Sequence, residues 1–357
     1  MPTTLLELWI TQSRRSWLQV TLLVGFAFVL LLVGTATLDG VLPTFTTDDW
    51  RFYLLGPAML MYLLAIQPHL RRLRDRAIEV FKPLLATDDE TFEAMVGEAY
   101  QLNYGLEWMA FGLGLLFGVL LDAPWGDPFS WLRLYRLLVV ALGFGLLGLL
   151  VYGALLGRKL FSRLQRQPLQ LNIFNPRGLE PIAQWSQGIA LAILGVITLS
   201  SLFLPSRLLH RPEPLIVFTT LGVVALAVFF LTLLDTHRVM RAAKYEALRK
   251  VRRYLWAAYQ TLPEEPPSSP PDPTMLAEPR ALDEDKAEPP DPWIPAPAVA
   301  SFWTWTTYEK RIQEAPEWPY TTNILRQLGA SFLLPTLIWV ARGVLTSAIM
   351  QALSLSQ

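Results

Sequence analysis

Long apolar stretches separated by short polar ones dominate the pattern of this chain. Most of them approach or exceed the roughly 18–20 apolar residues that cross a hydrocarbon layer ~30 Å thick. Because an unpaired backbone amide costs several kcal/mol in lipid, such stretches form helices. The pattern therefore predicts an all-α, polytopic helical membrane protein with about seven transmembrane helices, namely Trp17–Leu38, Phe52–Ile66, Leu106–Leu121, Leu132–Leu156, Ile182–Leu204, Leu215–Leu234 and Leu328–Ile349.

Composition supports a membrane protein and removes one class of chemistry. The chain has 357 residues, of which 52% are hydrophobic and 17% are charged, whereas soluble domains carry roughly 25% charged residues. Its 13 Trp residues are of the type that gathers at membrane–water interfaces. The chain contains no Cys, which excludes disulfides, thiolate catalysis and Cys-type metal sites.

The distribution of Lys and Arg predicts the orientation, because cytoplasmic loops retain these residues. The basic clusters alternate with acidic loops along the chain, and we assign to the cytoplasm Arg14 and Arg15, Arg71 to Lys82, Arg158 to Arg177, and Arg238 to Arg253. Five arginines at the opposite ends are expected to anchor in the interface, to contact lipid phosphate, or to pair with Asp122 or Asp127; they are Arg51, Arg133, Arg136, Arg207 and Arg211. This alternation predicts a cytoplasmic N-terminus and an external C-terminus.

The second predicted helix is the weakest of the seven, since it has about 15 core residues and contains Pro57. We expect it to extend past Gln67 or to begin at Trp50. Two cytoplasmic helices are predicted, roughly at His69–Leu85 and Asp88–Tyr104, and each is expected to run into a membrane helix.

The chain divides into three parts: residues 1–262 with helices one to six and their cytoplasmic extensions, residues 263–298, and residues 299–357 with helix seven. Helix six is predicted to continue through Asp235–Leu262, which has no Gly or Pro. Residues 263–298 are rich in proline and acidic residues, and this composition predicts a disordered linker. The aromatic segment Phe302–Tyr308 is predicted to be either an interfacial amphipathic helix or a helix docked on the cytoplasmic bundle.

An ionisable residue inside a membrane span is costly and is therefore a candidate functional residue. Arg342 is the clearest case; it either lines a hydrated or anion-binding surface or reaches the headgroups. Four residues of helix seven form the candidate pore or binding set, namely Arg342, Gln327, Ser331 and Thr346. Glu107 is interpreted as an interfacial carboxylate. Very few ionisable residues lie inside the spans, so the sequence predicts no central charged cavity.

Basic residues and glycines provide two further sets of candidates. The candidate lipid-phosphate contacts are Arg241, Lys244, Arg249, Arg252 and Arg253, because a juxtamembrane basic helix attracts anionic lipid on the cytoplasmic face. The candidate helix-packing residues are Gly114, Gly118, Gly153 and Gly157, because small residues let membrane helices approach closely. We expect this packing to be within one chain, although a homo-oligomer is an alternative.

Two stretches resemble those of a widespread set of uncharacterised bacterial polytopic inner-membrane proteins. They are Asn172–Pro181, which enters helix five, and Glu317–Tyr320, which precedes Leu325–Leu328 and Leu334–Pro335 in helix seven. The resemblance covers the chain from about Tyr152 onward and implies a bacterial inner membrane and a shared architecture. More loosely, the topology is similar to that of the insect gustatory and odorant receptor channels, whose last-helix signature is absent here.

Taken together, these features predict a non-enzymatic integral membrane protein with no cofactor, no metal site and no nucleic-acid partner. Three functional classes stay open. An oligomeric channel-like or sensor-like protein with helix seven at its centre predicts a polar stripe on that helix. A small-solute or lipid transporter predicts a central charged cavity. A structural or accessory subunit predicts a large cytoplasmic docking face.

Overall fold

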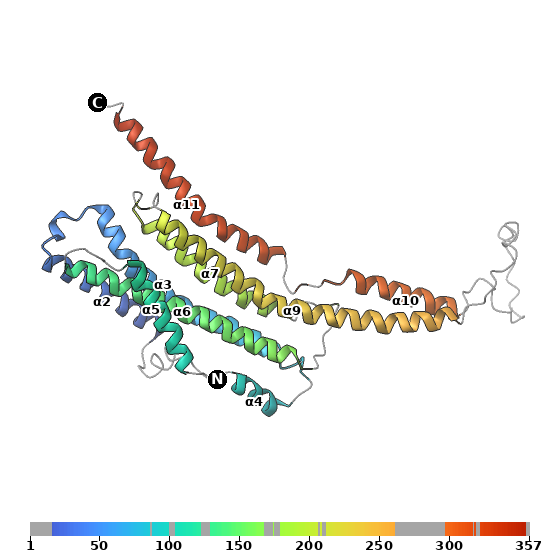
Figure 1. Ribbon diagram of the computed structural model, residues 1–357. Helices are drawn as coiled ribbons and strands as arrows, with labels where there is room; N and C mark the ends of the chain where they lie inside the picture. The colour runs from blue at the N-terminus through green and yellow to red at the C-terminus, as the bar shows by residue number, and fades with distance from the viewer. Residues whose placement is uncertain are drawn as a thin grey trace, which may run out of the picture. The chain divides into compact units, whose positions relative to one another are not determined.

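The regular elements of the chain are helical, as the apolar pattern predicts. The computed structural model describes residues 16–85, 88–99, 104–122, 129–167, 179–205, 212–260, 297–316 and 322–354, with the single positions 174, 208 and 318. Within these residues, seven helices are long and apolar enough to cross a membrane (Figure 1). The predicted number of helices of membrane-spanning length is therefore confirmed.

The helices fall into a long and a short group. The seven long apolar helices are α2 (Trp17–Leu38), α3 (Thr47–Glu79), α5 (Tyr104–Asp122), α6 (Trp131–Gln165), α7 (Glu180–Phe203), α9 (Pro212–Gln260) and α11 (Thr322–Ser354). The shorter elements are the 3-10 turn η1 (Leu42–Thr44), α4 (Asp89–Ala99) and α10 (Pro297–Glu314).

Helix α3 extends past Gln67, as expected for the short second span. It has 33 residues and continues without a break through Pro57 and Pro68. At about 1.5 Å per residue it is about 50 Å long, far more than a ~30 Å hydrocarbon layer requires. The helix predicted at roughly His69–Leu85 is the continuation of α3, which ends at Glu79, earlier than predicted, and is followed by turns.

Two other expectations concern the polar segments. Helix α9 is continuous over 49 residues, as predicted from its lack of internal breakers. Helix α4 covers Asp89–Ala99 of the predicted Asp88–Tyr104, and residues 100–103 lie outside the described residues. The predicted linker, residues 263–298, lies outside the described residues as far as residue 296, and α10 begins at Pro297.

The chain separates into two compact units. The first comprises residues 1–171, 175–238 and 318–357, and the second comprises residues 172–174 and 239–317. In the first unit α3 packs against α2, α6 and α7, while α5 packs on α6 and α11 packs on α7. The apolar window of α7 is 61% buried, whereas that of α5 is 11% buried. Helix α7 is therefore an interior helix and α5 a peripheral one.

Small residues set the close contact between α5 and α6. A Cβ built at Gly114 would meet the Phe144 carbonyl oxygen, and a Cβ built at Gly118 would lie 2.8 Å from the Cα of Ala141. Since real Cβ atoms do not approach other atoms this closely, only glycine permits the observed spacing. These two glycines therefore lie where the two backbones meet within one chain.

Both internal prolines of α3 leave a backbone carbonyl without its usual partner, because proline has no N–H to donate four residues back. The carbonyl of Leu64, freed by Pro68, accepts a 2.6 Å hydrogen bond from the indole Nε1 of Trp17 on α2. The carbonyl of Tyr53, freed by Pro57, accepts a 3.4 Å hydrogen bond from the hydroxyl of Tyr135 on α6. Side chains of neighbouring helices thus complete α3.

The N-terminus of α6 is also completed by another helix. Its own N-cap residue, Ser130, makes no capping bond within α6. Instead, Asp39 at the end of α2 accepts hydrogen bonds from the Ser130 hydroxyl at 2.6 Å and from the backbone N–H groups of Trp131 at 3.1 Å and Leu132 at 2.8 Å. The Ser130 hydroxyl, followed by the Leu132 amide, lowers the pKa of Asp39.

The second unit consists largely of α10 packed on the C-terminal half of α9. Leu248 and Val251 of α9 bury their side chains with Ile312 of α10. The rings of Tyr254 and Trp305 are stacked with their centroids 4.8 Å apart. The aromatic segment of α10 thus lies against a neighbouring helix, which is one of the two predicted alternatives.

Replacing Trp17 by Phe tests whether the indole hydrogen bond completes α3. We expect Trp17→Phe to lower the free energy of unfolding by about 1–3 kcal/mol, because the Leu64 carbonyl loses its donor inside the bundle. In a Pro68→Ala background the restored backbone N–H supplies that donor, so the same substitution should cost less. Chemical unfolding of all four variants in detergent measures the coupling, and additive effects would contradict the proposed role.

Candidate functional site

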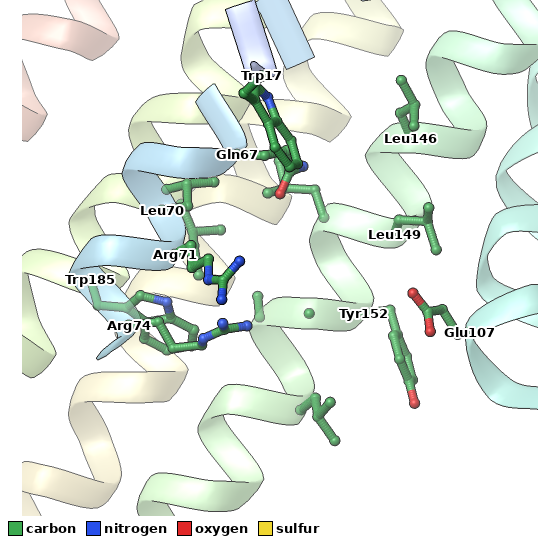
Figure 2. A pocket seen from close by; sticks show the side chains of 15 residues that line it. Trp17, Gln67, Leu70, Arg71, Arg74, Glu107, Leu146, Leu149, Tyr152 and Trp185 are labelled. Carbon is green, nitrogen blue, oxygen red and sulfur yellow. The ribbon is translucent and has the colours of Figure 1, made fainter. Parts of the chain in front are cut away.

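A small cavity lies at the end of the bundle where α2 and α7 begin. Its volume is about 90 Å³, and it lies between α2, α3, α5, α6 and α7. Polar and charged side chains enter it from two sides, as Figure 2 shows. The polar and aromatic lining residues are Trp17, Gln67, Arg71, Arg74, Glu107, Tyr152 and Trp185, and the remaining lining residues are mainly leucines of α6.

The positive side of the cavity belongs to α3. Gln67, Arg71 and Arg74 are four and three residues apart, so they share one face of the helix. Both arginines lie next to Asp75, whose carboxylate oxygens are 3.7 Å from Nε of Arg71 and 3.3 Å from Nε of Arg74. This face exists only because α3 continues as a helix past Pro68.

The negative side of the cavity is Glu107 in the first turn of α5. Its side chain is only 2% exposed, whereas the adjacent Trp108 is 60% exposed. The turn of the helix therefore directs the carboxylate inward and the indole outward. In Figure 2 the carboxylate points into the cavity from the side opposite Arg71 and Arg74, with Tyr152 next to it. A carboxylate in this position is also favoured by the positive end of the α5 dipole.

Aromatic and aliphatic side chains complete the walls. Trp185 of α7 is 3% exposed and lies over Gly157, where a Cβ would clash with its ring. Its ring also contacts that of Phe161, with centroids 5.0 Å apart. Leu149 and Ile189 form part of the apolar side. The cavity therefore combines a positive side, a negative side and aromatic faces in one small volume.

This arrangement suits a ligand that carries both charges. Guanidinium groups bind phosphate or carboxylate oxygens in a planar, bidentate manner. A carboxylate beside aromatic rings favours an ammonium group. Among the described residues, no group of three or more His, Asp or Glu side chains is placed to hold a metal ion.

Arg342 contacts the end of another helix. Its Nη1 atom donates to the carbonyl oxygens of Ser201 at 2.7 Å, Leu202 at 3.3 Å and Leu204 at 2.7 Å. Arg51 of α3 donates to the same Leu202 carbonyl at 3.0 Å. These are the carbonyls that the last turn of α7 leaves without intrahelical partners, so Arg342 caps α7 electrostatically and by hydrogen bonding.

The other candidate pore residues make local contacts where they are described. Gln327 accepts a 2.9 Å hydrogen bond from the side chain of Gln187 on α7. The Ser331 hydroxyl donates to the Gln327 carbonyl of its own helix at 2.9 Å. The side chain of Thr346 lies outside the described residues. Gln327 and Arg342 thus both contact α7, and the Ser331 hydroxyl bonds to the backbone of its own helix.

The candidate lipid-phosphate residues divide into two groups within the second unit. Lys244 donates to the carbonyls of Gln313 at 2.7 Å and Ala315 at 2.9 Å, at the end of α10. Arg241 lies over the ring of Tyr245, 5.4 Å from its centroid. The other three, which line a surface groove together, are Arg249, Arg252 and Arg253.

Arg252 also forms a 2.8 Å ion pair with Glu309 of α10.

Among the candidate packing glycines, Gly153 differs from Gly157 because no heavy atom of the described residues lies within 4 Å of a Cβ built there. Gly153 instead lines the charged cavity.

Sequence reasoning missed the charged cavity and predicted none among the spans. It assigned Arg71 and Arg74 to a cytoplasmic helix outside the membrane span and treated Glu107 as an interfacial carboxylate. The spacing of Gln67, Arg71 and Arg74 is the signal that was available, because it marks a polar face on a helix that continues from a membrane span. That signal required the helix to pass through Pro68.

Outside the cavity, Arg136 forms an ion pair with Asp122 at 2.8 Å. Pairing with Asp122 is one of the roles expected for the arginines assigned to the external side of the membrane.

Comparison of the chain with protein-family models, with curated proteins and with solved structures finds no match.

Replacing Arg342 tests whether it serves as the cap of α7. We expect Arg342→Leu to lower the free energy of unfolding by about 1.5–3 kcal/mol, because several backbone carbonyls lose a charged donor. Arg342→Lys should recover part of this loss. Arg326→Leu is the matched control, since Arg326 is an exposed arginine on the same helix. Equal stability of Arg342→Leu and wild type in thermal unfolding would rule out the capping role.

Proposed function

We propose that this chain is a multi-pass protein of a bacterial inner membrane that crosses the bilayer seven times. Seven helices of suitable length and composition support this proposal. The proposed orientation has a cytoplasmic N-terminus and an external C-terminus. It is supported by the arginines at the end of α3, since Arg71, Arg72, Arg74 and Arg76 follow its apolar part while Asp48 and Asp49 precede it.

Single cysteines test this orientation cleanly, because the chain contains no Cys. Thr44 and Glu90 are both exposed and lie in segments assigned to opposite sides of the membrane. We expect a membrane-impermeant thiol reagent to label Thr44→Cys in intact cells and to label Glu90→Cys only after the cells are opened. The reverse pattern would overturn the orientation, and labelling of both in intact cells would overturn the membrane placement.

We further propose that the protein is a transporter for a small zwitterionic solute or lipid headgroup. The observation that carries this proposal is the cavity in which Arg71 and Arg74 face Glu107. Of the three functional classes considered from the sequence, only the transporter requires a charged cavity inside the helix bundle. The ligand's anionic group would lie on the two arginines and its cationic group on Glu107.

The balance of charge favours a zwitterion over a simple anion. Arg71 and Arg74 contribute two positive charges, while Asp75 and ionised Glu107 contribute two negative charges, so the four groups sum to zero. A net-neutral ligand preserves this balance, whereas an anion alone places an uncompensated charge in a low-dielectric site. The 90 Å³ volume limits the bound part to a small group.

The channel-like or sensor-like alternative gains less support from the contacts of α11. Gln327 pairs with α7, Ser331 bonds within its own helix, and Arg342 caps α7. A pore lined by α11 needs its polar side chains on one face, and these contacts engage them elsewhere. The absence of enzymatic activity stays an expectation from the sequence.

Ligand-induced thermal stabilisation tests the proposed site. Phosphoethanolamine carries both charges in a small molecule, so we expect it to stabilise the wild type more than inorganic phosphate does. Arg71→Gln and Arg74→Gln should each weaken its binding by about tenfold to a hundredfold, because one charged hydrogen-bond donor is lost. Glu107→Gln should remove the preference for phosphoethanolamine over phosphate.

Arg72→Gln is the matched control, since Arg72 is exposed on the same helix and does not line the cavity. It should bind phosphoethanolamine like the wild type. Wild-type affinity in Arg71→Gln and Arg74→Gln would contradict the proposed site.

A further inference from the structure

A second, larger cavity lies at the opposite end of the first unit. Its volume is about 240 Å³, and it is bounded by α3, α5, α6, α7 and the first turns of α9. The deeper walls are apolar and include Met59, Leu147 and Val196. The rim includes Leu121, which is 46% exposed, so the cavity reaches the outer surface of the helix bundle.

A space of this size and polarity suits an apolar occupant. Protein interiors are close-packed and contain few voids larger than a water molecule, and an apolar cavity of roughly 150 Å³ in another protein stays dry and takes up benzene. A buried water needs two to four polar partners, which walls such as Met59, Leu147 and Val196 do not offer. The occupant is therefore apolar over most of its length.

One end of the cavity is polar. Arg136 forms an ion pair with Asp122, with 2.8 Å between Nη2 and Oδ1 and 2.9 Å between Nε and Oδ2. The Arg136 guanidinium also lies over the ring of Phe52, 5.4 Å from its centroid. The occupant consequently has a polar end at this ion pair and an apolar remainder deeper in the bundle.

The length of the cavity matches one membrane leaflet. Arg136 and Leu147 both line it and are eleven residues apart on α6, which corresponds to about 16 Å along the helix axis. Half of a ~30 Å hydrocarbon core is about 15 Å. A ligand with its polar end at Arg136 and its other end at Leu147 thus spans the depth of a single acyl chain.

We propose that this cavity binds one acyl chain of a membrane glycerophospholipid, with the glycerophosphate end at the Asp122–Arg136 ion pair. The site is separate from the charged cavity of Glu107, and the two share no lining residue. The lipid acts as a structural filler between α9 and the helices α3, α6 and α7. This proposal rests on the proposed membrane placement, but not on the transport of a zwitterion.

Photo-crosslinking in nanodiscs tests the site without any substitution. A phosphatidylcholine that carries a diazirine in the middle of one acyl chain should label the lining residues Val139, Leu147 and Val196, which are only 1%, 4% and 2% exposed and therefore out of reach of lipid outside the bundle. Labelling confined to exposed residues such as Leu113 and Leu116 would overturn the lipid site while leaving the membrane placement standing. No labelling anywhere would overturn the membrane placement itself.

Substitutions that fill the cavity provide a second test of the lipid site. Val140→Trp places a large ring in the cavity, whereas Leu138→Trp adds the same ring to a side chain that is 44% exposed on α6. Native mass spectrometry after detergent exchange should show about one retained phospholipid per chain in the wild type and in Leu138→Trp, and at least about a tenfold loss in Val140→Trp. Val217→Trp on α9 repeats the test from the opposite wall.

A wild type that retains no phospholipid, or a folded Val140→Trp or Val217→Trp that retains as much as Leu138→Trp, would overturn the proposal. If the tryptophan variants fail to fold, the crosslinked peptides of the wild type decide the question.

Discussion

The constraint on which the rest of this structure depends is that backbone polar groups inside an apolar helix bundle need partners from the protein itself. Where a helix cannot supply the partner, another helix does. Trp17 donates to the carbonyl that Pro68 frees, and Tyr135 donates to the one that Pro57 frees. At the helix ends, Asp39 completes the start of α6 and Arg342 completes the end of α7. These contacts hold neighbouring helices together because each joins two of them.

This constraint also separates two kinds of charged residue. Asp39 and Arg342 contact the ends of neighbouring helices and complete their backbones. Arg71, Arg74 and Glu107 instead project from helix sides into a shared cavity. Arg71 and Arg74 also lie beside Asp75, and ionisable groups that face an internal space of a membrane protein are candidates for a binding role. The second cavity contrasts with this one, since its walls are apolar and only its rim carries an ion pair.

The sequence was a good guide to the helices and a poor one to their ends. Apolar length alone predicted seven helices, and the absence of breakers predicted that α9 continues far beyond its apolar part. The sequence also predicted that the second helix extends past Gln67, but not what offsets its internal prolines, which usually cost about 3 kcal/mol or more inside a helix. Here the indole of Trp17 offsets part of that cost at Pro68. A contact between residues 47 positions apart cannot be recognised from local composition.

The sequence by itself determined the class of the protein, since hydrophobic length and charge distribution are local properties that no packing arrangement changes. It could also point to Arg342 as an unusual charge, but not to its partner. Only the tertiary structure decided that Arg342 meets the end of α7, that Gly114 faces Phe144, and that Glu107 shares a cavity with Arg71. The physical reason is that these relations depend on the rotation and spacing of whole helices. Helix rotation and spacing follow from packing across the bundle and from the pairing of buried polar groups, and both join residues far apart in the chain.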